Sequence, residues 1–268
     1  MITFLLTSLQ LFRISGVPVR AHVTFLVCAP GLLGWVAWHT RSCTAAVRLA
    51  LLLILLFGSL LVHEFAHVVV ARRFGCKTMD VLLLPIGCVA RLEDVPRGLR
   101  EIWTALAGPF ANAAIALLAW SALQFLGYPF HRRFVGTQRT LLALCIINSL
   151  LAIFNLIPCF PMDGGRVLRG LLTSLVRLVP TKRGAEGFLF ATTIAVRYVA
   201  RPLAVGLIVL TCLYTHVWTD VVLFGLVVLA GEAELYLIRT EPVTEQEPVE
   251  LQSSPSAEPD CGCLQGDP

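Results

Sequence analysis

The sequence predicts an all-α multi-span membrane protein with about six transmembrane helices and a short membrane-associated β-hairpin after the second. Of the 268 residues, 57% are hydrophobic and only 14% are charged, and the mean hydropathy is +0.79. Such a composition is typical of multi-span membrane proteins and excludes an ordinary soluble domain. Apolar windows of about 20 residues, the length that crosses a bilayer, recur along the chain.

The apolar windows place the spans in order at 21–38, 49–70, 102–126, 139–158, 199–215 and 217–236. The last two are short and are joined by residues 214–219, so one tight helical hairpin and a total of about five crossings stay open as an alternative. Between the second and third windows, residues 77–92 are rich in strand formers and are broken by Pro85 and Gly87. This change of pattern predicts the β-hairpin, whose exposed edge could accept an extended chain.

The positive charges predict that both termini face the cytoplasm of a cell that carries this protein in its membrane. With that orientation all but five of the 21 Lys and Arg residues fall on cytoplasmic segments, the exceptions being Arg41, Arg48, Arg132, Arg133 and Arg139. This asymmetry satisfies the positive-inside rule. The net charge of +4 therefore reflects membrane topology and contact with lipid, and it does not indicate nucleic-acid binding.

Residues 1–238 are predicted to form one membrane-embedded domain, and residues 239–268 an acidic, disordered cytoplasmic tail. The tail contains no Lys or Arg after Arg239 and is rich in acids and prolines. No internal repeat and no cleavable signal peptide are evident. Cys261 and Cys263 form a C-x-C pair in this tail, and the sequence assigns no role to them.

A cluster of ionisable residues interrupts the second predicted span. His63, Glu64 and His67 form the pattern H-E-x-x-H inside an apolar run that extends from Leu49 to Ala71. Ionisable side chains at membrane depth are costly and usually functional, and a structural role would waste their desolvation energy. Two histidines four residues apart lie about 40° apart around a helix, so both imidazoles can reach one metal ion.

Two zinc-binding histidines require a third protein ligand and an open position for water. The strongest candidate is Asp163, which follows the fourth predicted span at the same cytoplasmic depth as the histidines. Pro158 and Pro161 interrupt the helix before it, which frees backbone groups and opens a pocket to water. The alternative is that Asp163 only forms a turn or caps the following helix. In the third span, Asn112 needs a polar partner and is expected to brace the metal-bearing helix.

Together the two motifs resemble the site-2 protease family of intramembrane zinc metalloproteases. That family pairs H-E-x-x-H in one span with N-x-x-P-x-x-P-x-D-G in a later one, and this chain has both, at 63–67 and 155–164. The segments 107–112 and 16–22 also resemble the family, and the similarity covers roughly residues 10–238. The sequence shows no recognisable PDZ-like insertion or C-terminal nucleotide-sensing domain, so the expected form resembles the compact members of the family.

The resemblance implies a catalytic site and a substrate. His63, His67 and Asp163 would bind one Zn²⁺ ion, Glu64 would be the catalytic base, and Asn155 would stabilise the substrate carbonyl. The partners would be the lipid bilayer and a transmembrane protein or peptide, cleaved near the cytoplasmic face. The identities of the substrate and of a regulatory membrane partner are not readable from the sequence.

Three alternatives fit parts of the pattern. A transporter or channel could use the same ionisable residues as an ion relay, although no inverted repeat is visible. An inactive scaffold relative would usually lack a metal ligand or the base, and this sequence keeps all of them. A membrane zinc protease of another family, such as a prenyl-protein protease, would share only H-E-x-x-H, and the motif around Asp163 argues against it.

Overall fold

The structure is a computed structural model that describes residues 8–85, 87–92, 97–126, 137–176 and 185–203, with 205–206, 225, 228–229, 231–233 and 235–236. Four of its helices are long and apolar enough to cross a membrane: α2 (Val23–Thr40), α3 (Cys43–Arg73), α4 (Leu99–Phe125) and α5 (Thr137–Asn155). They correspond to the first four predicted spans. The windows at 199–215 and 217–236 lie largely outside the described residues, so the count of six stays a prediction.

Helix α3 is longer than the apolar window that predicts it. Its 31 residues extend about 46 Å, whereas the hydrocarbon core of a bilayer is about 30 Å thick. The helix begins where the Ser42 side chain accepts a hydrogen bond from the Ala45 N–H, and its last turn carries Arg72 and Arg73. His63 and His67 lie ten and six residues before the last residue of this helix, so both are displaced from its middle toward that end.

The prediction of an all-α fold with a single hairpin is wrong in one respect: the hairpin belongs to a four-stranded sheet with the order β1-β2-β3-β4. β3 (Thr78–Leu84) and β4 (Gly87–Leu92) form the hairpin at the predicted position, and β2 (Val17–His22) pairs with β3 in parallel. β1 (Ser8–Ile14) and β2 form a second hairpin ahead of α2.

The N-terminal hairpin has an identifiable local cause. Ser15 and Gly16 both have positive φ, 49° and 82°, which is the backbone that a two-residue turn between twisted strands requires. β2 then alternates between buried and partly exposed positions, as a strand with one covered face does. Hydropathy alone assigns the end of this strand to the first span, because Ala21 and His22 adjoin the apolar run of α2.

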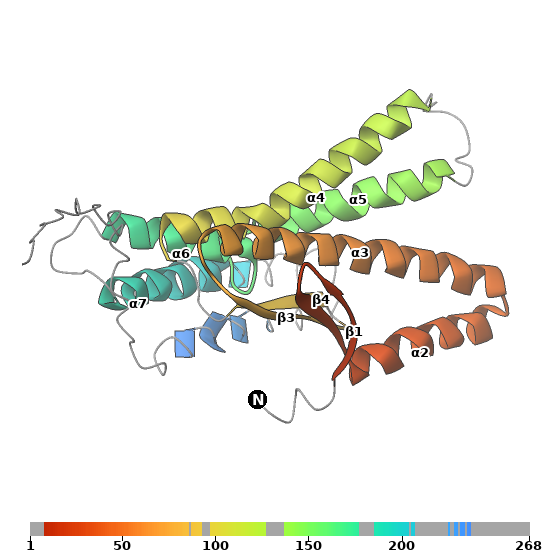
Figure 1. The fold of residues 1–268 in the computed structure, drawn as a ribbon, viewed down its shortest axis with the longest axis horizontal. Helices are drawn as coiled ribbons and strands as arrows, with labels where there is room; N and C mark the ends of the chain where they lie inside the picture. Colours follow the sequence, from red (N-terminus) through yellow and green to blue (C-terminus); the bar gives the residue numbers. More distant parts are fainter. Residues whose placement is uncertain are drawn as a thin grey trace, which may run out of the picture.

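The sheet packs against the end of α3 that carries the histidines (Figure 1). Val17, Val68 and Val81 form one buried cluster between the sheet and α3. A second cluster joins Val19, Ala21, Leu83 and Cys88 to apolar residues of α2 and α3. These contacts hold β4, the last strand in the sheet order, beside the H-E-x-x-H turn.

The remaining helices complete the same end of the molecule. α6 (Asp163–Val176) packs against α4 and α7 (Ala185–Ile194), and a short π-helix, η1 (Ala195–Ala200), follows α7. Figure 1 shows α6 and α7 together at one end, the sheet near the middle below α3, and the far ends of α2–α3 and α4–α5 extending away from α6 and α7. The sheet and the start of α6 therefore meet the part of α3 that bears the ionisable residues.

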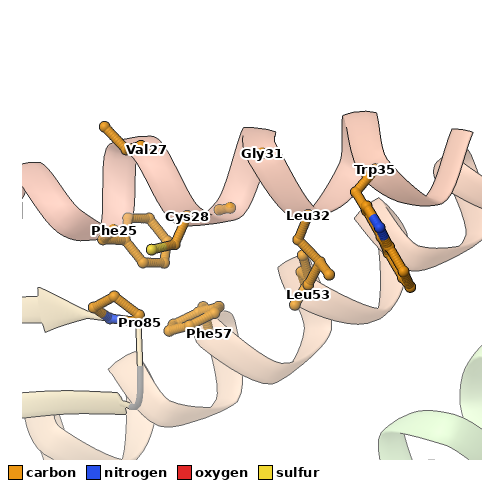
Figure 2. A pocket seen from close by; sticks show the side chains of 10 residues that line it. Phe25, Val27, Cys28, Gly31, Leu32, Trp35, Leu53, Phe57 and Pro85 are labelled. Carbon is orange, nitrogen blue, oxygen red and sulfur yellow. The ribbon is translucent and has the colours of Figure 1, made fainter. Parts of the chain in front are cut away.

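An apolar pocket of about 660 Å³ lies between α2 and α3. It is lined by side chains such as Phe25, Leu32, Leu53 and Phe57, and Pro85 at the β3–β4 turn closes one end (Figure 2). None of its lining residues carries a charge, and none belongs to the ionisable cluster. The pocket is suited to hydrocarbon and is separate from the candidate metal centre.

Candidate metal centre

Three side chains from two distant parts of the chain converge in the structure. His63 and His67 come from α3, Asp163 is the first residue of α6, and one ligand atom of each lies within 4.8 Å of the others. The Asp163 Oδ2 atom is 3.0 Å from His63 Nε2 and 3.2 Å from His67 Nε2, and the two Nε2 atoms are 3.1 Å apart. All three residues are buried, with exposed fractions of 3%, 4% and 6%.

These separations fit one tetrahedral metal ion. With metal–ligand distances near 2.1 Å, two ligand atoms of a tetrahedral zinc site lie about 3.4 Å apart. Two imidazole nitrogens and one carboxylate oxygen are also the donor set of a catalytic zinc site that keeps its fourth position for water. The residues present therefore fit Zn²⁺, and the prediction that Asp163 joins the histidines agrees with the geometry. Asp163 is also the first residue of α6, the position that the alternative of a turn or a cap had in view.

Helix α4 orients both imidazole rings from behind. His67 Nδ1 is 2.7 Å from the Thr104 carbonyl oxygen, which accepts the Nδ1–H and leaves Nε2 free for a metal. His63 Nδ1 is 3.1 Å from the side-chain amide of Asn112. A metal on His63 Nε2 needs an acceptor at Nδ1–H, and the buried Asn112 Oδ1 has no hydrogen-bond partner within the described part of the chain. A rotated amide would supply that acceptor.

The close approach of α4 depends on a glycine. A Cβ atom at Gly108 would lie 2.4 Å from His67 Nε2 and 2.6 Å from His63 Nε2, much closer than real contacts allow. Any larger residue would push α4 away from the imidazoles and break the contacts made by Thr104 and Asn112. The expectation that Asn112 braces the metal-bearing helix agrees with its contact to His63.

Asp163 is fixed by tight packing at the start of α6. A Cβ at Gly164 would lie 2.3 Å from the Ile157 carbonyl oxygen, so the helix starts directly against the preceding loop. Burial raises the pKa of the Asp163 carboxyl, but the adjoining His63, His67 and Arg166 side chains outweigh it and hold this pKa well below its ordinary value. Asp163 is therefore an ionised oxygen donor at neutral pH.

Glu64 lies next to His63 on α3 and is held by the sheet. Its Oε2 atom accepts a hydrogen bond from the Ala90 backbone N–H of β4 at 3.1 Å. The bond fixes a carboxylate next to the candidate metal position. The sequence carries no signal for this contact, since the donor is a backbone group 26 residues away.

The hydrogen bond of the Asn155 side chain lies within its own helix and does not involve the metal ligands. Asn155 is the last residue of α5, and its amide donates to the Leu151 carbonyl of the same helix at 2.9 Å. The role predicted for Asn155 at the substrate carbonyl therefore remains a prediction. Sequence reasoning also missed the Thr104 carbonyl and the tight fit at Gly108; the small residues around Gly108 were the only signal available.

Comparison with known proteins agrees with this geometry. The sequence profile described as peptidase family M50 matches residues 51–140 and 131–197. The zinc metalloprotease MJ0392 of Methanocaldococcus jannaschii is 36% identical over 171 residues, which are 62% of this chain and 46% of that protein. Stage IV sporulation protein FB of Bacillus subtilis (strain 168) is 31% identical over 152 residues, 56% of this chain and 46% of that protein. The chain thus spans about half the length of the curated relatives it matches.

A solved structure extends the similarity to the fold. The site-2 protease from Methanocaldococcus jannaschii superposes with a TM-score of 0.58 at 30% sequence identity, covering 88% of this chain and 99% of that chain. The segments that match the sequence profile of the family contain the H-E-x-x-H helix and the segment around Asp163. This chain belongs to peptidase family M50, the site-2 protease family.

Proposed function

We propose that this protein is an intramembrane zinc metalloprotease that hydrolyses a peptide bond in or near a transmembrane segment of a membrane protein. The observation that carries the proposal is the convergence of His63, His67 and Asp163 within 4.8 Å, with Glu64 anchored beside them. His63, His67 and Asp163 would hold one Zn²⁺ ion. The names of the relatives, zinc metalloprotease and site-2 protease, support the same reaction.

Bound zinc supplies Lewis acidity, which activates water as a nucleophile and polarises a carbonyl. Glu64 takes the proton from the attacking water and passes it to the leaving amine. The Ala90 N–H keeps the Glu64 carboxylate turned toward the site while it waits for this proton. The Asn155 amide, released from the Leu151 carbonyl by rotation of its side chain, would donate to the developing oxyanion, an interaction worth about 3 kcal/mol in hydrolases.

The edge of β4 would receive the substrate. β4 is last in the sheet order, and the Ala90 N–H on it reaches Glu64, so this edge runs past the catalytic base. A substrate segment that unwinds from a helix and pairs with β4 as an extended strand would bring its backbone carbonyls next to Glu64. The transmembrane segment of the substrate would remain in the lipid bilayer.

The proposed placement in the cell membrane follows the charge asymmetry of the sequence. Both termini are on the cytoplasmic side, and the metal centre is near the cytoplasmic face. Arg72 and Arg73 end α3 two turns beyond the histidines, which supports this depth. Residues 1–238 form the membrane-embedded unit, and residues 239–268 a separate acidic tail.

The proposal is tested by comparing cells that express the wild type with cells that express Glu64→Gln. This variant retains the proposed zinc ligands but has no base. We expect fragments of the membrane proteins that the enzyme cleaves to persist in the variant, because general-base catalysis contributes about a hundredfold or more. Quantitative mass spectrometry of membrane peptides measures this. Equal levels of every membrane-embedded fragment in both strains would refute the proposal.

A further inference from the structure

Arg169 and Glu101 form a fully buried ion pair outside the metal centre. The exposed fractions of the two residues are 1% and 0%. The Arg169 Nε and Nη2 atoms lie 2.7 Å and 2.6 Å from the same Glu101 oxygen, Oε1. Burying two charges costs about as much free energy as their attraction returns, so such a pair is weak evidence for stability alone. The retention of charges at this position calls for a reason other than stability.

The Arg169 guanidinium joins several elements at one point. It binds α4 through Glu101, and it stacks over the ring of Phe160 in the loop before α6, 5.1 Å from the centroid. It also stacks over Phe188 of α7 at 4.9 Å, and Arg97 covers the same ring at 5.0 Å. Arg169 therefore fixes α6 and the residues just before it against two neighbouring helices.

The elements joined by this pair are those that build the metal centre. α6 begins with Asp163, six residues or about 9 Å of helix rise before Arg169. On α4, Glu101 precedes by one turn Thr104, whose carbonyl oxygen orients His67. The pair thus connects the helix that supplies the carboxylate with the helix that orients the imidazoles.

The contact between α4 and α6 is close enough for this connection to matter. A Cβ at Gly170 would lie 2.9 Å from the Gly98 carbonyl oxygen and 2.8 Å from the Ile102 side chain. Gly170 has no side chain of its own that could interlock with Gly98 and Ile102 and so set the register of the two helices. A short directional bond from the neighbouring Arg169 sets it instead. Metal sites tolerate ligand displacements of only about 0.2 Å, so a slip of α6 along α4 would withdraw Asp163 from the histidines.

We propose that Arg169 and Glu101 are positioning residues that hold Asp163 in register with His63 and His67 and thereby set the zinc affinity of the protein. The inference rests on the proposed function, in that the three residues bind zinc. Both of the contacting nitrogens, Nε and Nη2, are required, because a lysine ammonium provides a single point of attachment and cannot stack on Phe160 and Phe188 in the same way.

The test measures zinc affinity and stability separately on the full chain in detergent. Zinc is removed with a chelator, the dissociation constant is obtained by competition with a chromogenic zinc chelator, and thermal unfolding of the zinc-free protein is followed by circular dichroism. In the double variant Glu101→Leu/Arg169→Met, apolar side chains of similar size replace the pair, which buried sites often tolerate. We expect its unfolding temperature to stay near that of the wild type and its zinc affinity to fall about tenfold or more.

A matched control comes from another pair with a buried carboxylate. Asp80 on β3 is 3% exposed and pairs with Arg91 of β4 and Arg20 of β2, away from α4 and α6. Asp80→Asn is expected to lower the unfolding temperature and to leave zinc affinity unchanged. A merely structural ion pair would behave in this way.

Wild-type zinc affinity in the folded double variant would overturn the positioning role. If the double variant does not fold, Arg169→Lys decides the question, since it keeps the positive charge opposite Glu101. An approximately tenfold loss of zinc affinity in Arg169→Lys is then expected, and wild-type affinity would refute the proposal. If the wild type itself binds no zinc, the proposed metal function fails. If the wild type and the double variant bind zinc equally well, only the positioning role fails.

Discussion

At the scale of single residues, the structure shows how an apolar helix can present two imidazoles to one ion. His63 and His67 each use one ring nitrogen toward the cluster and the other toward α4. The second contact fixes which nitrogen is available, because a ring whose Nδ1–H is bonded to an acceptor exposes a free Nε2. The chemistry of the centre therefore depends on residues that never touch the metal.

Asn112 provides the first prediction. Asn112→Leu removes the group that faces His63 Nδ1, and we expect the zinc affinity to fall by about 10- to 100-fold, as loss of a partner that orients a ligand does. Asn112→Asp is the matched control. A carboxylate oxygen accepts from Nδ1–H, so this variant should retain zinc affinity close to that of the wild type. Chelator competition measures both variants, and an unchanged affinity in Asn112→Leu would show that the amide does not orient His63.

Gly108 provides the second prediction. Gly108→Ala places a Cβ atom against both imidazoles, and we expect the purified protein to bind zinc more than about tenfold more weakly. Gly58→Ala is the control, since a Cβ at Gly58 on α3 meets no atom within 4 Å. Zinc content by atomic absorption compares the two variants. Equal zinc content in both would mean that α4 can move away from the histidines without loss.

At the scale of elements, the sheet is the part of the fold that positions the catalytic base. β4 is held by β3 on one side and offers the Ala90 N–H to Glu64. Proline is tolerated on an edge strand where the missing N–H is not part of the ladder. The Ala90 N–H donates to Glu64 and not to a neighbouring strand. Removal of this N–H should therefore leave the sheet intact.

Ala90→Pro is therefore expected to lower proteolysis by about a hundredfold, a loss typical of a displaced catalytic group, while zinc content stays at the wild-type level. Ala90→Gly keeps the N–H and should retain activity. The membrane fragments that accumulate with Glu64→Gln serve as the readout. Full activity in Ala90→Pro would show that the sheet does not position Glu64.

The sequence predicted those elements whose signal is local. The first four spans follow from hydropathy, and the β3–β4 hairpin follows from the strand formers around Pro85 and Gly87. The parallel pairing of β2 with β3 joins residues about 60 positions apart, and no local pattern reports it. Residues 8–20 lie before the first apolar window and contain Arg13 and Arg20, so hydropathy indicated no element there, and it assigned Ala21 and His22 to the first span.

The same distinction holds within the site. His63, Glu64, His67 and Asp163 belong to motifs made of side chains, and these were predicted. The Thr104 carbonyl and the Ala90 N–H are backbone groups, which every residue carries and no sequence marks. Arg169 was counted only as a cytoplasmic positive charge, because its burial against Glu101 depends on how α4 and α6 pack.

At the scale of the whole molecule, the fold concentrates its polar elements at one end of a bundle of apolar helices. The sheet packs against the half of α3 that carries the histidines, α6 brings Asp163 to them, and the opposite ends of the long helices extend away (Figure 1). This asymmetry is the arrangement that a hydrolase in a membrane requires, because water must reach the metal while a substrate segment stays in lipid. The boundary at residue 238 and the orientation of the termini remain predictions.

The central claim is that α3 and α6, which contribute ligands one hundred residues apart, bind a single zinc ion. Its most direct test is the zinc content of the protein, purified in detergent without added metal, for the wild type and for Asp163→Ala. The account predicts close to one zinc ion per wild-type chain and loss of most of it in Asp163→Ala, because two imidazoles alone make an incomplete site. A wild type without zinc, or an Asp163→Ala variant with undiminished zinc, would contradict it.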